Sequence, residues 1–185
     1  MTFIETFLIA LGLAMDASAV SMAVACGGYA DSSRTTFRLA FHFGLFQFMM
    51  PVIGWFIGNR FVSFFSTFGT LAACIILVFL GVKMIRSGLG KPMECASRDP
   101  SRGWDLIGLS LATSIDALAA GLGLGFLDID IWQPAVIIGI VTLALSSAAC
   151  IIGKTLGVLF GTKMEVFGGL VLIISGIKIL MGNWV

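Results

Sequence analysis

Charge is scarce in this sequence: only 11% of its 185 residues are Asp, Glu, Lys or Arg, whereas a soluble domain carries about 25%. The net charge of +1 gives no basic field to attract phosphate, which excludes a nucleic-acid-binding role. Hydrophobic residues make up 58% of the chain, and the mean hydropathy is +1.06. So short a chain cannot bury that much apolar surface in a soluble core. We therefore expect a polytopic protein embedded in a lipid bilayer.

Residues that bind zinc or act as nucleophiles are also few. The four cysteines are scattered without CxxC spacing, and three fall inside apolar runs, so neither a disulfide framework nor a zinc site is expected. They are interpreted as small buried hydrophobic residues plus one loop thiol: Cys26, Cys74, Cys95 and Cys150. The one histidine, His42, lies in an apolar span, so no Ser–His–Asp set is expected and the chain is not predicted to be an enzyme.

Six apolar segments are long enough, at about 20 residues each, to cross a membrane as helices. They are residues 3–27, 36–58, 68–88, 104–126, 133–157 and 165–184. The connection over 89–103 is longer and charged, which is typical of a solvated linker. Lys and Arg gather in this linker and in the loops on the same side of the spans, which the positive-inside rule assigns to the cytoplasm. Both termini are therefore expected outside the cytoplasm.

The two halves of the chain match each other. Residues 11–19, LGLAMDASA, match residues 111–119, LATSIDALA, while Gly54 and Gly58 match Gly153 and Gly157. The step Gly81-Val82-Lys83 matches Gly176-Ile177-Lys178. Because each half holds an odd number of spans, the second enters the membrane in the opposite sense. The predicted fold is all-α, with six transmembrane helices in two inverted three-helix repeats: 1–88, the linker 89–103, and 104–185.

Two aspartates, Asp16 and Asp116, lie near the centres of spans 1 and 4 at equivalent positions of this repeat. An ionised carboxylate in hydrocarbon costs at least about 2.5–3.5 kcal/mol, so each must face a partner, water or an ion. Gly and Ala residues flank both aspartates and allow close helix approach. Transporters with inverted repeats bind their substrate near the midplane, between the halves. We therefore expect both carboxylates at one central site.

Neutral oxygens lie at similar depth, on Gln47 in span 2 and on its repeat equivalent Ser146 in span 5. Carboxylate, amide and hydroxyl oxygens together favour magnesium, calcium or manganese over zinc or copper. Four nearby side chains are further candidates for binding the metal, accepting a proton or pairing with the aspartates. For Met15, Met22 and His42 a packing role is favoured. For Lys83, as for its equivalent Lys178, a snorkelling anchor is favoured over a charge partner of the aspartates.

The stretches Met15 to Ser21, MDASAVS, and Ala112 to Ala119, ATSIDALA, resemble the paired signatures of the MntP-type manganese efflux pumps. The run Phe41 to Trp55, FHFGLFQFMMPVIGW, resembles the second span of that family. The resemblance covers essentially the whole chain. It implies a bacterial inner-membrane exporter with Mn²⁺ as transported substrate, no cofactor, and Asp16 and Asp116 as the central acidic residues. Some members have Glu where this chain has Gln47, whose amide can neither become negatively charged nor take up and release a transported proton.

These observations combine into a hypothesis of alternating access. Asp16 and Asp116 hold Mn²⁺, Gln47 and either Ser146 or Thr113 supply neutral oxygens, and the halves rock to open the site outward. Counter-transported protons are the favoured source of energy, because the chain has no nucleotide-binding domain. Two alternatives stay open. One is an exporter of another divalent cation or of a small amino compound. The other is a non-transporting membrane scaffold, which has no reason to place two aspartates at symmetric depth.

Overall fold

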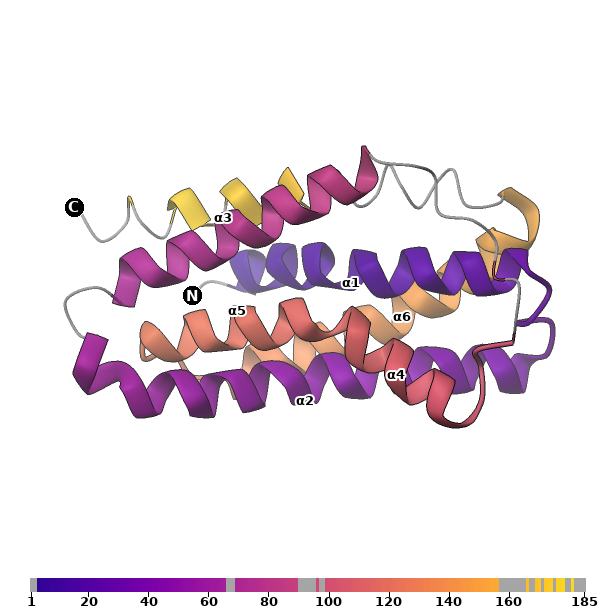
Figure 1. Ribbon diagram of the computed structural model, residues 1–185, viewed down its shortest axis with the longest axis horizontal. Helices are drawn as coiled ribbons and strands as arrows, with labels where there is room; N and C mark the ends of the chain where they lie inside the picture. Colours follow the sequence, from indigo (N-terminus) through magenta and orange to yellow (C-terminus); the bar gives the residue numbers. More distant parts are fainter. Residues whose placement is uncertain are drawn as a thin grey trace.

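The structure is a computed structural model that describes residues 3–65, 69–89, 96 and 99–156, together with residues 166, 169–170, 172–174, 176–178 and 181. Its helices are α1 (Phe3–Cys26), α2 (Ser33–Phe65), α3 (Gly69–Gly88), α4 (Gly103–Thr113), α5 (Ile115–Phe126) and α6 (Trp132–Leu156). The described residues between 166 and 181 are also helical and lie beside α3 (Figure 1). No strand occurs in the described part of the chain, which confirms the all-helical prediction.

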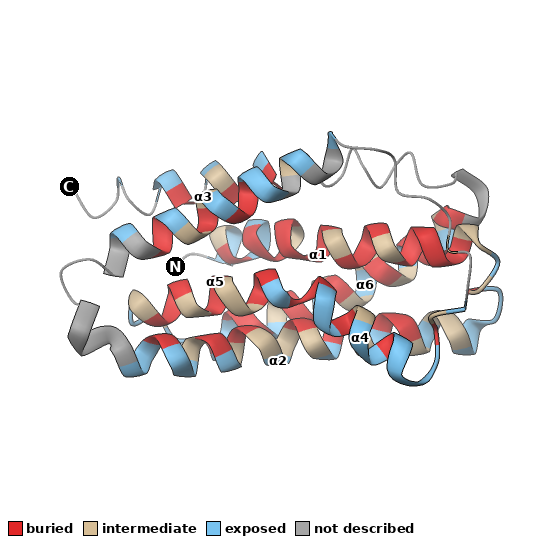
Figure 2. Cartoon of the chain, viewed as in Figure 1, coloured by how far each residue is buried: buried red, intermediate tan, exposed pale blue. Residues whose placement is uncertain are grey.

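Exposed residues follow the outward faces of the helices (Figure 2), and many of them are large and apolar, as are the residues of the core. On α2, for example, large apolar residues are exposed at four-residue steps: Phe37, Phe41, Leu45, Met49 and Ile53. Within the described residues, α1, α2 and α6 are each long and apolar enough to cross a membrane, and α4 with α5 qualifies as one bent span. A helix that is hydrophobic all round is typical of a membrane span. The chain is therefore a multi-span membrane protein.

The fourth span is broken, so the prediction of one continuous helix over 104–126 is wrong. Helix α4 ends at Thr113 and α5 begins at Ile115, with a bend of 41° between them. The hydroxyls of Ser110, Thr113 and Ser114 donate to backbone carbonyls about one turn earlier in α4. Such side-chain bonds compete with the helical backbone and bend helices. The break therefore follows from three hydroxyls close together at the end of α4.

The helices pack across the two halves of the chain. Helix α1 lies against α6, α2 lies against α5, and α2 crosses α6 (Figure 1). Glycines allow these close contacts: Gly54 of α2 faces the carbonyl of Leu118 in α5, and Gly153 of α6 packs on the backbone of Met22 in α1. Helix α3 packs against α5. The core is thus shared between segments that are far apart in the sequence.

The segment between the halves is fastened to one end of the bundle. The backbone N–H of Ala96 donates to the carbonyl of Ala23 at the end of α1 (3.0 Å). Arg38 of α2 donates from Nε to the carbonyl of Ser101 (2.6 Å) and from Nη2 to its hydroxyl (3.0 Å). Ser101, through its side chain and its backbone N–H, holds the pKa of the Asp99 carboxyl below its ordinary value. The linker and the α1–α2 loop therefore lie at the same end, as expected.

One expectation about the cysteines is wrong. Cys26, at the end of α1, is disulfide-bonded, and its partner lies outside the described residues. Cys74 and Cys150 are buried and form no disulfide, as expected of small hydrophobic residues. Sequence spacing gives no sign of such a bond, because the linker reaches the end of α1 only through the tertiary fold, as the Ala96–Ala23 contact shows.

Candidate functional site

Asp16 and Asp116 meet in the interior of the bundle. Asp16 is half-buried in the middle of α1, and Asp116 is 3% exposed in the first turn of α5. Their carboxyl groups are close enough to interact directly. Asp116 Oδ1 accepts the backbone N–H of Ala117 (2.9 Å), while Oδ2 has no hydrogen-bond partner in the described structure. Because α5 begins beside Asp116, the peptide dipoles of this helix favour a negative charge there.

Gln47 joins α2 to the other two helices at this level. Its side chain is fully buried, and Nε2 donates to the carbonyls of Leu13 in α1 (2.9 Å) and Thr113 at the end of α4 (3.3 Å). The orientation of the amide leaves Oε1 without a partner among the described residues. Thr113 takes part through this carbonyl, because its own hydroxyl donates back to Leu109 and Ser110 of α4 (3.1 Å each). The break in span 4 is therefore where Gln47 binds.

Two hydroxyls of α6 face α1 at the same depth. Cys150 Sγ donates to the Ser21 carbonyl of α1 (3.8 Å). Ile138, earlier in α6, lines the same cavity as Ile9, earlier in α1, so the two helices run side by side in the same direction. One turn earlier on both helices, this register places Ser146 of α6 level with Ala17 of α1. Two turns earlier, it places Thr142 level with Leu13, the residue whose carbonyl accepts a hydrogen bond from Gln47. Both side chains are fully buried, and neither hydroxyl oxygen has a partner in the described part of the chain. Sequence reasoning missed Thr142, although it lies one turn from Ser146 on the same face.

Lys83 is a charge neighbour of the aspartates, which is the role that the sequence interpretation disfavoured. Its ammonium interacts electrostatically with both Asp16 and Asp116. Lys83 and Asp116 also line one cavity of about 320 Å³ between α3 and α5, whose other lining residues are apolar: Ile75, Ile76, Phe79, Leu80, Ile115 and Ala119. Its repeat equivalent, Lys178, is instead paired with Glu5 near the start of α1. The two lysines therefore have different surroundings.

The remaining candidates lie outside this cluster. His42 is half-buried, and its Nδ1 donates to the Arg38 carbonyl of its own helix (2.7 Å). Met15 and Met22 are buried in the apolar core. These contacts agree with the packing roles that the sequence favoured.

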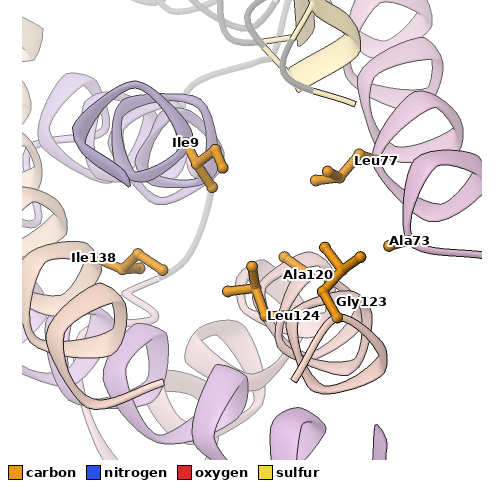
Figure 3. Close-up of a pocket in the computed structure, with 8 residues that line it drawn as sticks. Ile9, Ala73, Leu77, Ala120, Gly123, Leu124 and Ile138 are labelled. Carbon is orange, nitrogen blue, oxygen red and sulfur yellow. The ribbon is translucent and has the colours of Figure 1, made fainter. Parts of the chain in front are cut away.

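Apolar side chains close the cluster on two sides. Toward the start of α1, residues of α1, α3, α5 and α6 point toward one another around a cavity of about 10 Å³: Ile9, Leu77, Ala120, Leu124 and Ile138 are among them (Figure 3). A space of this size barely holds one water, and it has no polar lining to bind it. Toward the linker, a second cluster contains Val24, Leu39, Phe43 and Leu106. The carboxylates therefore lie between two dry layers.

Comparison of the sequence with known proteins found a matching family and several relatives. The profile of the Mntp family, described as "Putative manganese efflux pump", matches residues 31–180. A relative from Oleidesulfovibrio alaskensis, named "Putative manganese efflux pump MntP", is 45% identical over 93% of this chain and 92% of its own length. A relative of the same name from Syntrophotalea carbinolica is 45% identical over 97% and 96%. A third, from Methanothermobacter thermautotrophicus, is 40% identical over 99% and 98%. No solved structure gave a significant match.

The family profile spans most of the sequence, and each of these relatives aligns over nearly its full length. The resemblance of the sequence to the manganese efflux pump family is thereby confirmed. This chain belongs to the MntP family.

Proposed function

We propose that this protein exports Mn²⁺ from the cytoplasm by alternating access, with Asp16 and Asp116 as the central ligands. The names of its relatives point to manganese efflux. The observation that carries the site assignment is the meeting of two carboxylates, 100 residues apart in the sequence, inside an otherwise apolar bundle. Two ionised carboxylates at such close range repel each other unless a cation or a proton joins them. A dication neutralises both.

Neutral oxygens complete the proposed shell. The described residues contain no group of three or more His, Cys, Asp or Glu side chains that could hold a metal. The unpartnered oxygens of Gln47, Thr142, Ser146 and Asp116 are acceptors available at this depth among the described residues, and Thr113 adds its main-chain carbonyl. An all-oxygen set suits Mn²⁺, Mg²⁺ or Ca²⁺ and disfavours zinc and copper. The proposed substrate therefore agrees with the donor chemistry.

The inverted repeat of residues 1–88 and 104–185, joined by the linker 89–103, is the proposed basis for alternating access. Matched contacts support it. Gly81 of α3 packs on Gly169 and Ile173. Its repeat equivalent, Gly176, packs on Cys74 and Val78. Cys74 is the repeat equivalent of Gly169, and Val78 is the repeat equivalent of Ile173. Equivalent helices also run in opposite directions: α1 toward the linker end, and α4 with α5 away from it (Figure 1).

A second matched contact joins the two halves. Gly54 packs on Leu122 of α5, and its equivalent Gly153 packs on Met22 of α1, the residue that corresponds to Leu122. A pair of similar interfaces related by inversion can open in alternation, one toward each side of the membrane. In this proposal the two apolar layers beside the aspartates are the two gates, and the linker end faces the cytoplasm with both termini outside.

Proton counter-transport is the proposed energy source. Moving a dication out against a potential of 100 mV costs roughly 4.6 kcal/mol, at about 2.3 kcal/mol per charge. Protons that neutralise Asp16 and Asp116 on the return step would supply this energy in the bacterial inner membrane. Efflux from proteoliposomes under an imposed pH gradient tests the coupling, and export that is indifferent to the gradient rejects it.

The function itself is tested by growth in excess manganese. Cells that express Asp16→Asn or Asp116→Asn should be as sensitive as cells without the protein, because each change removes one negative charge from the site. Asp130→Asn is the matched control, since Asp130 is exposed in the loop after α5. Full protection by both site variants would refute the assignment.

Substrate choice is tested by competition. In proteoliposomes, transport of labelled Mn²⁺ by the purified protein should be inhibited little by Zn²⁺. If Mg²⁺, Ca²⁺ or Fe²⁺ inhibits this transport more strongly than unlabelled Mn²⁺ does, the alternative of another divalent substrate is favoured.

A further inference from the structure

We propose that Lys83 is a tethered counter-cation of the transport site, which compensates the aspartate pair when the site is empty and weakens the hold on the metal so that it is released. This inference rests on the proposed function, because it assumes that Asp16 and Asp116 bind the metal. It assigns a role to a residue that hydropathy alone would treat as an anchor at the end of a span.

The position of Lys83 is fixed by the packing of α3. Two residues earlier, Gly81 packs closely on Gly169 and on Ile173, so α3 cannot move inward or outward without breaking this contact. The side chain that leaves α3 two residues later shares one cavity with Asp116, and its ammonium interacts with both carboxylates. Among the residues that line this cavity, Lys83 and Asp116 are the two that carry charge.

Charge balance gives this arrangement a function. After the metal leaves and before protons bind, the two ionised aspartates carry a charge of −2 in an apolar interior, which is costly. A lysine ammonium beside them removes half of that charge. When a dication binds, the ammonium is repelled, and the cavity of about 320 Å³ gives the flexible side chain room to turn away. Lys83 lies near the end of α3, which is at Gly88, so its long side chain can extend toward that end of the helix when it leaves the carboxylates.

The equivalent lysine of the second half provides the natural control. Lys178 occupies the matching position of the repeat, but it forms an ion pair with Glu5 and its side chain is 65% exposed. A general role of these lysines as anchors predicts that both respond alike to substitution. A role as counter-cation predicts that only Lys83 changes metal binding.

The experiment compares wild type with Lys83→Gln, Lys83→Met, Lys83→Arg and Lys178→Gln as purified full-length proteins. Mn²⁺ binding is measured by the loss of the free Mn²⁺ electron paramagnetic resonance signal, and the efflux rate at saturating Mn²⁺ is measured in proteoliposomes. Lys83→Gln and Lys83→Met should lower the Kd by about tenfold, because a positive charge close to the bound dication is lost. Their maximal efflux rate should fall, because release slows. Lys83→Arg and Lys178→Gln should resemble wild type.

Several results would overturn the inference. They are an unchanged Kd in Lys83→Gln and Lys83→Met, a weaker affinity in these variants, or an equal change in Lys178→Gln. Size-exclusion elution and thermal melting identify any variant that is misfolded. Because Lys83→Gln and Lys83→Met differ in polarity, the test can still be made if one of them does not fold. Asp116→Asn separates this inference from the proposed function. If Asp116→Asn binds Mn²⁺ as wild type does, the metal site itself is wrong, whereas loss of binding there with unchanged Lys83 variants rejects only the role of Lys83.

Discussion

Replacing Gly121 with alanine should force α5 away from α2 and destabilise the protein. Gly121 lies on α5 against Pro51 of α2, in the same interface as Gly54. A Cβ atom at position 121 would face the carbonyl oxygen of Pro51 and lie 2.5 Å from its Cα. These are backbone atoms, which cannot turn aside as a flexible side chain can. The methyl group therefore fits only if the two helices separate.

The size of the effect follows from this distance. An ordinary Cβ contact begins at about 3.4 Å, so the helices must retreat by at least about 0.9 Å. A gap of about 0.5–1 Å already forfeits a quarter to a half of the attraction between packed atoms. Overpacking of this kind costs typically about 1–3 kcal/mol, and the higher helix propensity of alanine offsets up to about 1 kcal/mol of that. We expect a net loss of about 1–2 kcal/mol for Gly121→Ala.

Thermal unfolding in detergent, followed by tryptophan fluorescence, measures this loss. A change of 1 kcal/mol shifts the Tm of a protein of this size by about 2–4 °C, so Gly121→Ala should lower the Tm by about 2–8 °C. Gly108→Ala is the matched control. Gly108 is exposed in α4, and an added Cβ there would meet nothing within 4 Å. This control should leave the Tm unchanged or raise it slightly.

A double variant sharpens the test. Gly54→Ala should also separate α2 from α5, and one separation makes room for both methyl groups. The double variant with Gly121→Ala should therefore lose less stability than the two single losses combined, as coupled neighbours do. Equal Tm values for Gly121→Ala and Gly108→Ala, or strictly additive losses in the double variant, would refute the close-packed α2–α5 interface.

Three further predictions concern single contacts. Gln47→Leu should cost about 1–3 kcal/mol in chemical unfolding, because the buried Thr113 carbonyl at the helix break loses its amide donor; an unchanged midpoint would contradict that bond. The Asp99 carboxyl has a pKa below its ordinary value of 3.8, because Ser101 donates to it. The contribution of these hydrogen bonds to stability is therefore complete above about pH 3.8 and is lost as the pH falls through the lower pKa of the folded state. Faster hydrogen exchange of the Ser101 amide, relative to its intrinsic rate at each pH, should report this loss. Trp55→Phe removes an indole donor to the loop after α5 (2.7 Å) and should cost about 1 kcal/mol in the same unfolding assay.

The sequence predicted the class of this protein and the depth of its acidic residues, because both depend on local composition. Hydropathy over windows of about 20 residues places the spans whatever their neighbours are. The energetic cost of a carboxylate in hydrocarbon identifies Asp16 and Asp116 as residues that need a partner, and the match between the halves indicates that each could be the other's neighbour. Of the six predicted spans, the last lies largely outside the described residues, so its continuity stays a prediction.

The tertiary structure decided how these side chains are used. The break at Ser114 depends on which carbonyls the hydroxyls of α4 select, and hydropathy does not register that choice. The proximity of Lys83 to the aspartates, and the depth that Thr142 shares with Gln47, depend on the rotation and register of helices that are distant in the sequence. Close glycine contacts such as Gly81 on Gly169 set that register. Composition determines which residues must leave the lipid, but only the fit between helix surfaces determines which residues they meet.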